Sequence, residues 1–426
     1  MRLMRPRTLL PLVVTVLLLL MIYQSPRHHT HAHAFVAVPA PAPDLFDSGS
    51  FYRLTTLFQG ECKSLDIVND GRNNNQPILA KTANVSGQYW KITSLGGGYY
   101  RLTTQWQGEG KSLDILNDGR KNNQPFLGRT GNFSGQFWRI TPLGNDIYRL
   151  TTQWQGPGKS LDIVNDGRAN NKPILAATGN FSGQTWHISL AKFVTAPPAS
   201  LQLNSFYRQY LDADGIPVIS SGRVPVEALY RVRFMALQML SRIPQAKAEM
   251  IRHGARIAVM SKDEQTLDIP EHAFLKDDHS VPDWNARARG LGGTVAVPTG
   301  SCAEENVMCY AGDRYHDEDI FIHEFSHSIH KLGLVFAFPE FQRDLQRAYS
   351  YAIRHARWIM TYAASNSDEY FAEGVQDWFN VNAERNPPDG VHNFVNTRAE
   401  LKTYDPNLYN LLKRYFPEDD NKCTCH

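Results

Sequence analysis

The sequence has no strong excess of charge of either sign, because 44 Lys and Arg residues face 42 Asp and Glu residues. Proteins whose main partner is nucleic acid carry concentrated basic charge, so this balance argues against that class. The five cysteines include no Cys-x2-Cys pair, which argues against a cysteine-based zinc site. A chain of 426 residues that is 42% hydrophobic is long enough for two or three domains with buried cores.

The N-terminus lacks a small-residue cleavage site at the place where a secretory signal peptide would have one. Three arginines among the first seven residues precede an apolar stretch at 8–23, which is the pattern of such a signal. The first small-residue motif, Ala32-His33-Ala34, lies about eleven residues too far along. Residues 1–34 are therefore either a signal peptide or an uncleaved type II signal anchor, with a linker. Either one predicts that the rest of the chain is secreted or lies on the lumenal side of a membrane.

The cysteines are compatible with an oxidising compartment. Cys302 and Cys309 are seven residues apart, and we predict a disulfide between them that closes a small loop. The partners of Cys62, Cys423 and Cys425 stay open. An odd total leaves at least one thiol free or paired between chains.

The first half of the chain contains a sequence repeat. Three units between residues 50 and 190 end in Trp90, Trp138 and Trp186, each 48 residues apart. Short apolar stretches within each unit are separated by Asn-Asp-Gly and Ser-Gly turns, which predicts about four β-strands per unit. Because the repeat stops at three copies, a closed barrel with three-fold symmetry is favoured over a solenoid.

Each unit closes with a Gln-x-Trp motif, at Gln88, Gln136 and Gln184. In this motif and in its repeat, the segment resembles the ricin-type β-trefoil lectins. The resemblance implies an all-β trefoil over residues 50–192, whose tryptophans fill the core. It also implies glycans or glycoproteins as partners, held by an aspartate early in each unit. The matching aspartates are Asp66, Asp114 and Asp162.

The units also depart from the family pattern. The family's sugar-binding Asn before Gln-x-Trp is replaced by Gly87, Gly135 and Gly183, and the first of its paired cysteines by Ser64, Ser112 and Ser160. The alternative to a sugar site is therefore a trefoil that mediates attachment without one. Asn-x-Ser sequences at Asn84, Asn132 and Asn180 are candidates for N-glycosylation, or they simply shape a turn.

A composition change follows the repeat. Residues 193–204 contain the stretch TAPPAS and form a linker, after which we predict a second domain at 205–420 and a short tail with two cysteines at 421–426. Apolar residues recur at helical spacing over 227–243, whereas 255–260 reads as a buried strand.

A second motif, His-Glu-x-x-His, lies at residues 323–327 inside a predicted helix over 318–332. On a helix, residues four apart share one face, so His323 and His327 can reach one metal ion while Glu324 lies near a water on that ion. Zinc in catalytic sites takes three protein ligands and a water, so a third ligand is required. The alternative is a solvated, histidine-rich helix whose face includes His330.

Gly333 is the predicted end of this helix. Upstream of the helix, residues 290–298 form a glycine-bounded segment. That segment is either an ordinary strand or an edge strand along which an extended substrate pairs.

A second helix is predicted within residues 362–381. Asn366 is its expected N-cap, and Glu369 and Glu373 lie four residues apart on one face. Two carboxylates buried without partners would be costly. A metal ion for one and a metal-bound histidine for the other would remove that cost, whereas a solvated acidic face is the alternative.

The order Tyr362, Asn366, Glu369, Tyr370, Phe371, Ala372 and Glu373 after His-Glu-x-x-His resembles the gluzincin zinc peptidases. The nearest pattern is the peptidase domain of anthrax lethal factor, over about 60 residues, with Tyr370 in place of Phe as a departure. The resemblance implies an α+β, zincin-like domain that binds Zn²⁺ through His323, His327 and Glu369. It also implies that Glu324 is the general base, Tyr362 stabilises the oxyanion and Glu373 holds His323.

These expectations combine into one hypothesis. The chain is predicted to be a secreted or membrane-anchored zinc metallopeptidase that hydrolyses peptide bonds with a zinc-activated water and is targeted by its lectin-like trefoil. The rival hypothesis is a carbohydrate-binding protein with a catalytically silent peptidase-like domain. Glu324 and Tyr362 favour the enzyme, because a purely structural metal site would need neither.

Overall fold

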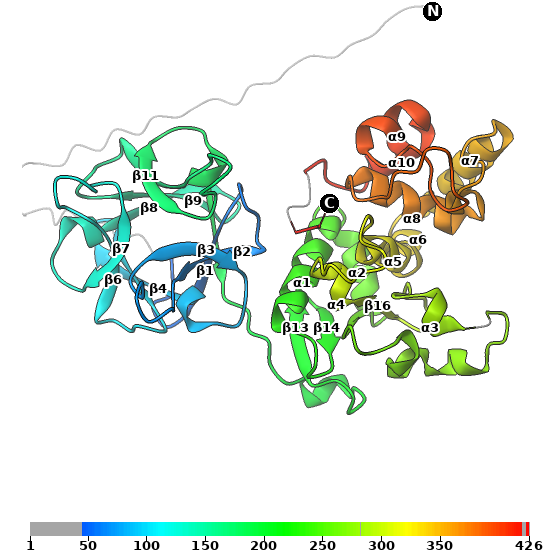
Figure 1. The fold of residues 1–426 in the computed structure, drawn as a ribbon, viewed down its shortest axis with the longest axis horizontal. Coiled ribbons are helices and arrows are strands. Elements are labelled where there is room, and N and C mark those ends of the chain that lie inside the picture. The colour runs from blue at the N-terminus through cyan, green and yellow to red at the C-terminus, as the bar shows by residue number, and fades with distance from the viewer. Residues whose placement is uncertain (1–44, 282, 420–422, 426) are drawn as a thin grey trace, which may run out of the picture. The chain divides into compact units, whose positions relative to one another are not determined.

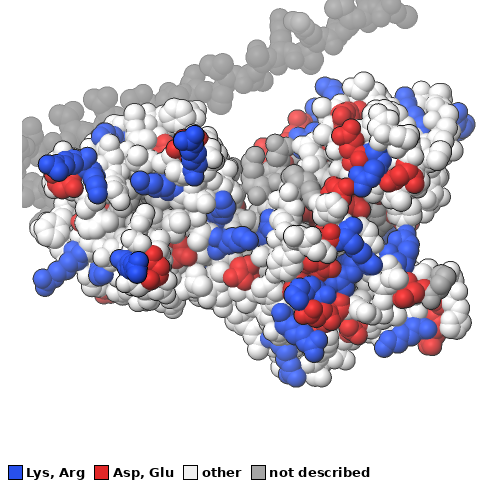
Figure 2. All heavy atoms as spheres, in the orientation of Figure 1, with Lys and Arg blue, Asp and Glu red and all other residues white. Residues whose placement is uncertain are grey.

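The computed structural model describes residues 45–281, 283–419 and 423–425, which form an N-terminal β region and a C-terminal region of helices and sheet (Figure 1). The predicted signal or anchor at 1–34 lies outside these residues. Across the described ranges, no helix combines the length and the apolar character that a membrane span requires. Basic and acidic side chains are interspersed over the face drawn in Figure 2, in keeping with the balanced composition.

Residues 50–190, all of which the structure describes, fold as twelve strands, four from each unit, as the repeat predicts. β1, β12, β9, β8, β5 and β4 form a closed barrel in that order, and the other strands pair as the hairpins β2–β3, β6–β7 and β10–β11. The strands are β1 (Tyr52–Thr56), β2 (Lys63–Ile67), β3 (Pro77–Lys81), β4 (Trp90–Gly96), β5 (Tyr99–Thr104), β6 (Lys111–Ile115), β7 (Pro125–Arg129), β8 (Trp138–Gly144), β9 (Ile147–Thr152), β10 (Lys159–Ile163), β11 (Pro173–Ala177) and β12 (Trp186–Leu190).

The three repeat tryptophans fill the barrel core. Trp90, Trp138 and Trp186 are fully buried. Each indole N–H donates a hydrogen bond of 2.8 Å to a leucine carbonyl 25 residues earlier in its own unit. Burying an aromatic side chain of this size stabilises a core by several kcal/mol only if its polar N–H finds a partner, as it does here.

The units are also linked to one another in a ring. Lysine ammonium groups donate to asparagine side chains of the unit before, with N–O distances of 2.5 to 2.7 Å. The pairs are Lys63–Asn171, Lys111–Asn75 and Lys159–Asn123. Since the first unit bonds to the third, the contacts close the ring as the barrel strands do.

The C-terminal region contains a four-stranded sheet in the order β13 (Gln209–Ala213), β14 (Ile216–Ser220), β15 (Arg256–Met260) and β16 (Thr299–Ala303). β13 and β14 are antiparallel, whereas β14, β15 and β16 are parallel, so the sheet is mixed. The predicted strand at 255–260 is therefore confirmed as β15. The structure confirms a separate C-terminal region that combines helices and a sheet, whereas the zincin-like fold stays a prediction.

Helices α1, α4 and α5 contact strands of this sheet, and the predicted helix at 227–243 is confirmed as α1. The helices are α1 (Val226–Leu240), α2 (Pro244–Arg252), α3 (Trp284–Arg287), α4 (Glu304–Val307), α5 (Ile320–Ile329), α6 (Val335–Ala337), α7 (Phe341–Arg354), α8 (Ser367–Trp378), α9 (Arg398–Tyr404) and α10 (Pro406–Leu412). α5 and α8 lie side by side (Figure 1), and they carry the two motifs found in the sequence. Their apolar faces share one core with α1 and the sheet.

The predicted disulfide between Cys302 and Cys309 is wrong. Cys309 pairs with Cys425, and Cys62 pairs with Cys423, while Cys302 is a buried free thiol. Cys302 lies on β16 with its side chain in the core, and α4 then turns the chain away before Cys309. A short sequence spacing therefore does not bring the two sulfurs together.

Disulfide mapping tests this pairing. We expect non-reducing proteolysis and mass spectrometry to recover linked peptides for Cys62–Cys423 and Cys309–Cys425, because the fold brings the two cysteines of each pair together. Cys302 should react with an alkylating reagent only after unfolding, since it is buried. A peptide that links Cys302 to Cys309 would contradict the fold around β16.

Candidate metal centre

The first part of the centre is α5. Its N-cap is Asp319, whose carboxylate accepts a hydrogen bond of 3.0 Å from the backbone N–H of Ile322 and so satisfies one of the free donors at the helix start. Phe321, Ile322, Phe325 and Ile329 of α5 are buried in the core. This fixes the rotation of the helix, so that His323 and His327 project from the opposite side.

The predicted end of this helix at Gly333 is wrong. A π-helical turn over His330–Leu334 continues α5 into α6, and turns of this kind often occur near functional sites. Gly333 serves close packing instead of termination. A Cβ atom there would lie 3.0 to 3.1 Å from Ala246 and Met250 of α2.

His330 is neither a ligand nor a solvated residue. Its side chain is fully buried, its Nε2 lies 2.8 Å from Gln342 Oε1, and its Nδ1 lies 3.6 Å from Asp368. Burial lowers the pKa of His330 to about 4, so the ring is neutral at physiological pH. The alternative of a solvated histidine-rich face therefore fails at this residue.

The second part of the centre is α8, which begins as predicted. The Asn366 side chain accepts hydrogen bonds from the backbone N–H groups of Asp368 and Glu369, at 2.9 and 3.0 Å. This cap fixes the first turn of α8, and Glu369 in that turn faces the two histidines of α5.

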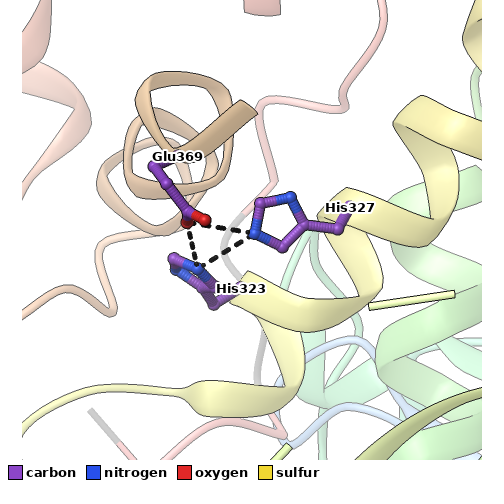
Figure 3. A group of neighbouring side chains, drawn as sticks. All are labelled: His323, His327 and Glu369. Atoms are coloured by element: carbon purple, nitrogen blue, oxygen red, sulfur yellow. Dashed lines mark hydrogen bonds and ion pairs between the residues drawn. The ribbon is translucent and has the colours of Figure 1, made fainter. Parts of the chain in front are cut away.

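The structure brings the three predicted ligands together (Figure 3). Glu369 Oε2 lies 3.2 Å from His323 Nε2 and 3.2 Å from His327 Nε2, and the two nitrogens are also 3.2 Å apart. A tetrahedral zinc ion with ligands at about 2.0–2.1 Å requires about 3.3–3.4 Å between ligand atoms. The triad therefore has the spacing and the donor atoms to hold such an ion.

The residue that holds the Nδ1 atom of His323 differs from the prediction. The Nδ1–H of His323 donates to Gln376 Oε1 at 2.8 Å, whereas the predicted partner, Glu373, is farther away at 3.5 Å. The Gln376 amide is oriented by its Nε2, which donates to Glu318 Oε2 and to the Asp319 carbonyl. A proton held on Nδ1 leaves Nε2 as the lone-pair donor toward the triad. Gln376 stands seven residues after Glu369, and that two-turn spacing was the available signal.

Two further side chains line the same cleft as the triad. Glu324 comes from α5 one residue after His323, and desolvation raises the pKa of its carboxyl group. Tyr362 begins a short 3₁₀ turn at Tyr362–Ala364, and its ring stacks on His323 with centroids 6.3 Å apart. Burial, together with the nearby Glu369 carboxylate, raises the pKa of Tyr362 to about 12, so its hydroxyl keeps a proton to donate at neutral pH.

These residues line a cleft of about 690 Å³. α5 and α8 supply the triad, while α3 and the segment 290–294 supply further lining. The segment 290–298 is not a regular strand. Among its residues, only Leu291 forms a β-bridge, and its partner is Ser301 on β16. Neither an ordinary strand nor an edge strand therefore forms over this segment, and pairing with an extended substrate stays a prediction.

The glycines of this segment allow it to approach α5 closely. A Cβ atom on Gly292 would lie 2.4 Å from the Cβ of His327. We expect Gly292→Ala to lower the free energy of unfolding by about 1–3 kcal/mol, because the added methyl group overpacks this contact. Denaturant unfolding measures the change, with Gly312→Ala as the matched control, where nothing lies within 4 Å of the added Cβ. Equal stability of the two variants would contradict the close approach.

The predicted sugar-binding aspartates make their side-chain contacts within the trefoil. Asp66, Asp114 and Asp162 each use both carboxylate oxygens inside the trefoil: one accepts from the next backbone N–H, and the other from the Gln-x-Trp glutamine of the same unit. Gly87, Gly135 and Gly183 make room for them, since an added Cβ would lie 2.2 to 2.3 Å from a carboxylate oxygen. These contacts give the aspartates a structural role whether or not a sugar binds.

The three glycosylation candidates are exposed but differ in their contacts. Asn84 donates to the Val194 carbonyl at 3.3 Å and accepts from the Tyr89 hydroxyl. Asn132 and Asn180 are both exposed. Within the described part of the chain, their side chains form no hydrogen bond. The latter two are the more accessible acceptors.

Comparison with known proteins bears on the trefoil. Residues 86–177 match the model of a family described as ricin-type beta-trefoil lectin domain-like. No curated protein matches the chain. The N-terminal region is therefore a lectin-like β-trefoil.

Similar solved structures include a designed three-fold symmetric protein, ThreeFoil, with 25% identity over 33% of this chain and 99% of that chain and a TM-score of 0.30. A ricin B-like lectin of Macrolepiota procera in complex with lactose has 20% identity over 35% of this chain and 100% of that chain, with a TM-score of 0.29. The C-half of the earthworm R-type lectin in complex with GalNAc has 17% identity over 33% and 99%, with a TM-score of 0.25.

Proposed function

We propose that the C-terminal region is a zinc-dependent peptidase. The observation that carries the proposal is the triad of His323, His327 and Glu369, whose mutual distances of 3.2 Å suit one tetrahedral ion. Three protein ligands leave a fourth position for water, and catalytic zinc sites use that number. The presence of Glu324 and Tyr362 at the same cleft favours catalysis over a structural metal.

Each side chain then has a defined task. Bound zinc would supply a Lewis acid that polarises the scissile carbonyl and acidifies water. Glu324 accepts the proton of the attacking water and delivers it to the leaving amine. Tyr362 donates a hydrogen bond to the carbonyl oxygen as it gains negative charge, an interaction worth about 3 kcal/mol in comparable sites. Gln376 holds the ring of His323, so that its Nε2 faces the triad.

The test is hydrolysis of a diverse peptide library by the full chain, purified from a secretory host and loaded with zinc. We expect cuts that a zinc chelator blocks and that added zinc restores. A folded, zinc-loaded chain that cuts no peptide would overturn the proposal and leave the silent, lectin-only alternative.

For the trefoil, the match to a lectin-like family favours a second role. We propose that it binds glycans or glycoproteins and thereby targets a secreted or membrane-anchored enzyme to its substrates. A glycan array probed with the full chain tests this role, because binding to no glycan would leave the trefoil as an attachment module without a sugar site.

A further inference from the structure

One arginine at the cleft contacts a residue of the proposed catalytic machinery. Arg287 is the last residue of α3, and its Nη2 donates a hydrogen bond of 3.1 Å to the Tyr362 hydroxyl. Its guanidinium carbon lies 5.5 Å from the centre of the Tyr362 ring. Arg287 therefore holds a positive charge beside the hydroxyl that we place at the oxyanion.

The other Lys and Arg residues that line the cleft are already paired. Arg289 forms a two-point ion pair with Glu305 at 2.6 and 2.9 Å. Lys331 pairs with Asp368 at 2.5 Å. Arg287 is exposed, and no carboxylate among the described residues lies within ion-pair distance of its guanidinium. Of the cationic side chains described at the cleft, it alone is available to a ligand.

The carboxylates that line the cleft have other partners or other tasks. Glu369 faces the two histidines, Asp368 pairs with Lys331, and Glu318 lies 3.4 Å from His392. Glu373 accepts from Asn382, and Glu324 is the proposed base. The planar guanidinium of arginine matches a carboxylate with two parallel N–H groups, so an incoming carboxylate is the ligand that Arg287 fits.

The backbone that carries Arg287 is fixed on both sides. Four successive carbonyls, at residues 285–288, each accept a hydrogen bond from a side chain. The donors are Arg314 for the first two, the Tyr315 hydroxyl for Arg287 itself, and Thr266 for the fourth. An arginine that merely covers a solvated surface needs no such support, whereas a binding group gains from being held in place before its ligand arrives.

We propose that Arg287 selects substrates by binding a carboxylate close to the scissile bond. The proposal rests on the peptidase function proposed above. Because Arg287 touches Tyr362, and Tyr362 contacts the reacting carbonyl, the bound carboxylate belongs to a residue next to the cleaved bond. It comes either from an Asp or Glu side chain or from the free C-terminus of a short peptide.

The test compares matched peptides. Internal peptides carry Glu or Gln in turn at each position around the cut, and a second set ends in a free carboxylate or an amide. We expect kcat/KM to be at least about 10-fold higher for the carboxylate member at one position, the discrimination that one charge-assisted hydrogen bond supplies. A preference for Glu over Gln identifies a side chain as the source, whereas loss on amidation identifies the C-terminus.

Variants assign the preference to the arginine. Arg287→Ala should bring the ratio of carboxylate to neutral peptide close to one, and Arg287→Lys should retain part of it, because the charge stays and the fork is lost. A loss of activity caused by disturbing Tyr362 lowers kcat/KM for both peptides alike, so it does not change the ratio between them. Arg347→Ala on α7, an exposed arginine outside the cleft, is the charge-matched control and should keep the ratio.

Two outcomes overturn the proposal, and they can be told apart. Hydrolysis without any preference for a carboxylate, or a preference that survives Arg287→Ala, refutes the role of Arg287 and leaves the peptidase intact. No hydrolysis of any peptide refutes the peptidase and, with it, the substrate selection.

Discussion

Glu324→Gln should lower peptide hydrolysis by about 10²–10⁴-fold, the usual contribution of a general base. Glutamine has almost the same size and shape as glutamate, but its amide cannot accept a proton from water at neutral pH. Glu324 is outside the triad, so the variant should still bind zinc with wild-type stoichiometry. Kinetics on a cleaved library peptide and metal analysis of the same preparation check both halves of this result.

A matched control separates the base from a general charge effect. Glu418→Gln removes one carboxylate at an exposed ion pair with Lys413 and should leave hydrolysis unchanged. Loss of zinc in Glu324→Gln would instead mean that Glu324 supports the metal. Full activity in that variant would mean that the proton goes elsewhere.

Glu369→Ala should remove zinc binding, with a loss of affinity larger than the 10–100-fold that follows from removing an outer partner of a ligand. Two histidines remain, and two ligands hold zinc far less well than the three that converge within 3.2 Å. Saturating zinc at about 100 times its Kd should add about 2.7 kcal/mol of stability to the wild type and nothing to this variant. Thermal unfolding with and without zinc, together with calorimetric titration, measures the difference.

The neighbouring residue provides the control for this experiment. Asp368→Ala removes a carboxylate from the same turn of α8, but Asp368 pairs with Lys331 instead of joining the triad. This variant should keep the zinc-induced stabilisation. If both variants lost it, the turn as a whole and not the Glu369 ligand would be responsible.

The trefoil and the helices that carry the triad could be predicted, because both depend on local sequence patterns. The repeat with Trp90, Trp138 and Trp186 determines the trefoil, because each unit buries the same few residues at the same spacing. Helical spacing on α5 places His323 and His327 on one face, and the cap at Asn366 indicates the start of α8. The choice of Glu369 over Glu373 as the third residue came from the resemblance to the gluzincin peptidases, because local spacing treats the two carboxylates alike.

Features set by tertiary contacts could not be predicted. Cys309 meets Cys425 across 116 residues, and nothing near either cysteine indicates it. Gly333 resembles a helix end in sequence, but its role depends on α2, which packs against it. Arg287 lies 75 residues from Tyr362, and only the fold brings the two side chains together.

The ring of lysine and asparagine contacts in the trefoil bears on how this region can evolve. Recombination between the three similar repeats would add or remove one 48-residue unit. A protein with two or four copies would not form the same closed set of three hydrogen bonds between units. In that set, Lys63 donates to Asn171, Lys111 to Asn75 and Lys159 to Asn123. Such a protein would also leave barrel edges open. The asparagine of each unit is therefore constrained by the lysine of another unit, and its loss would weaken the contact between the two units.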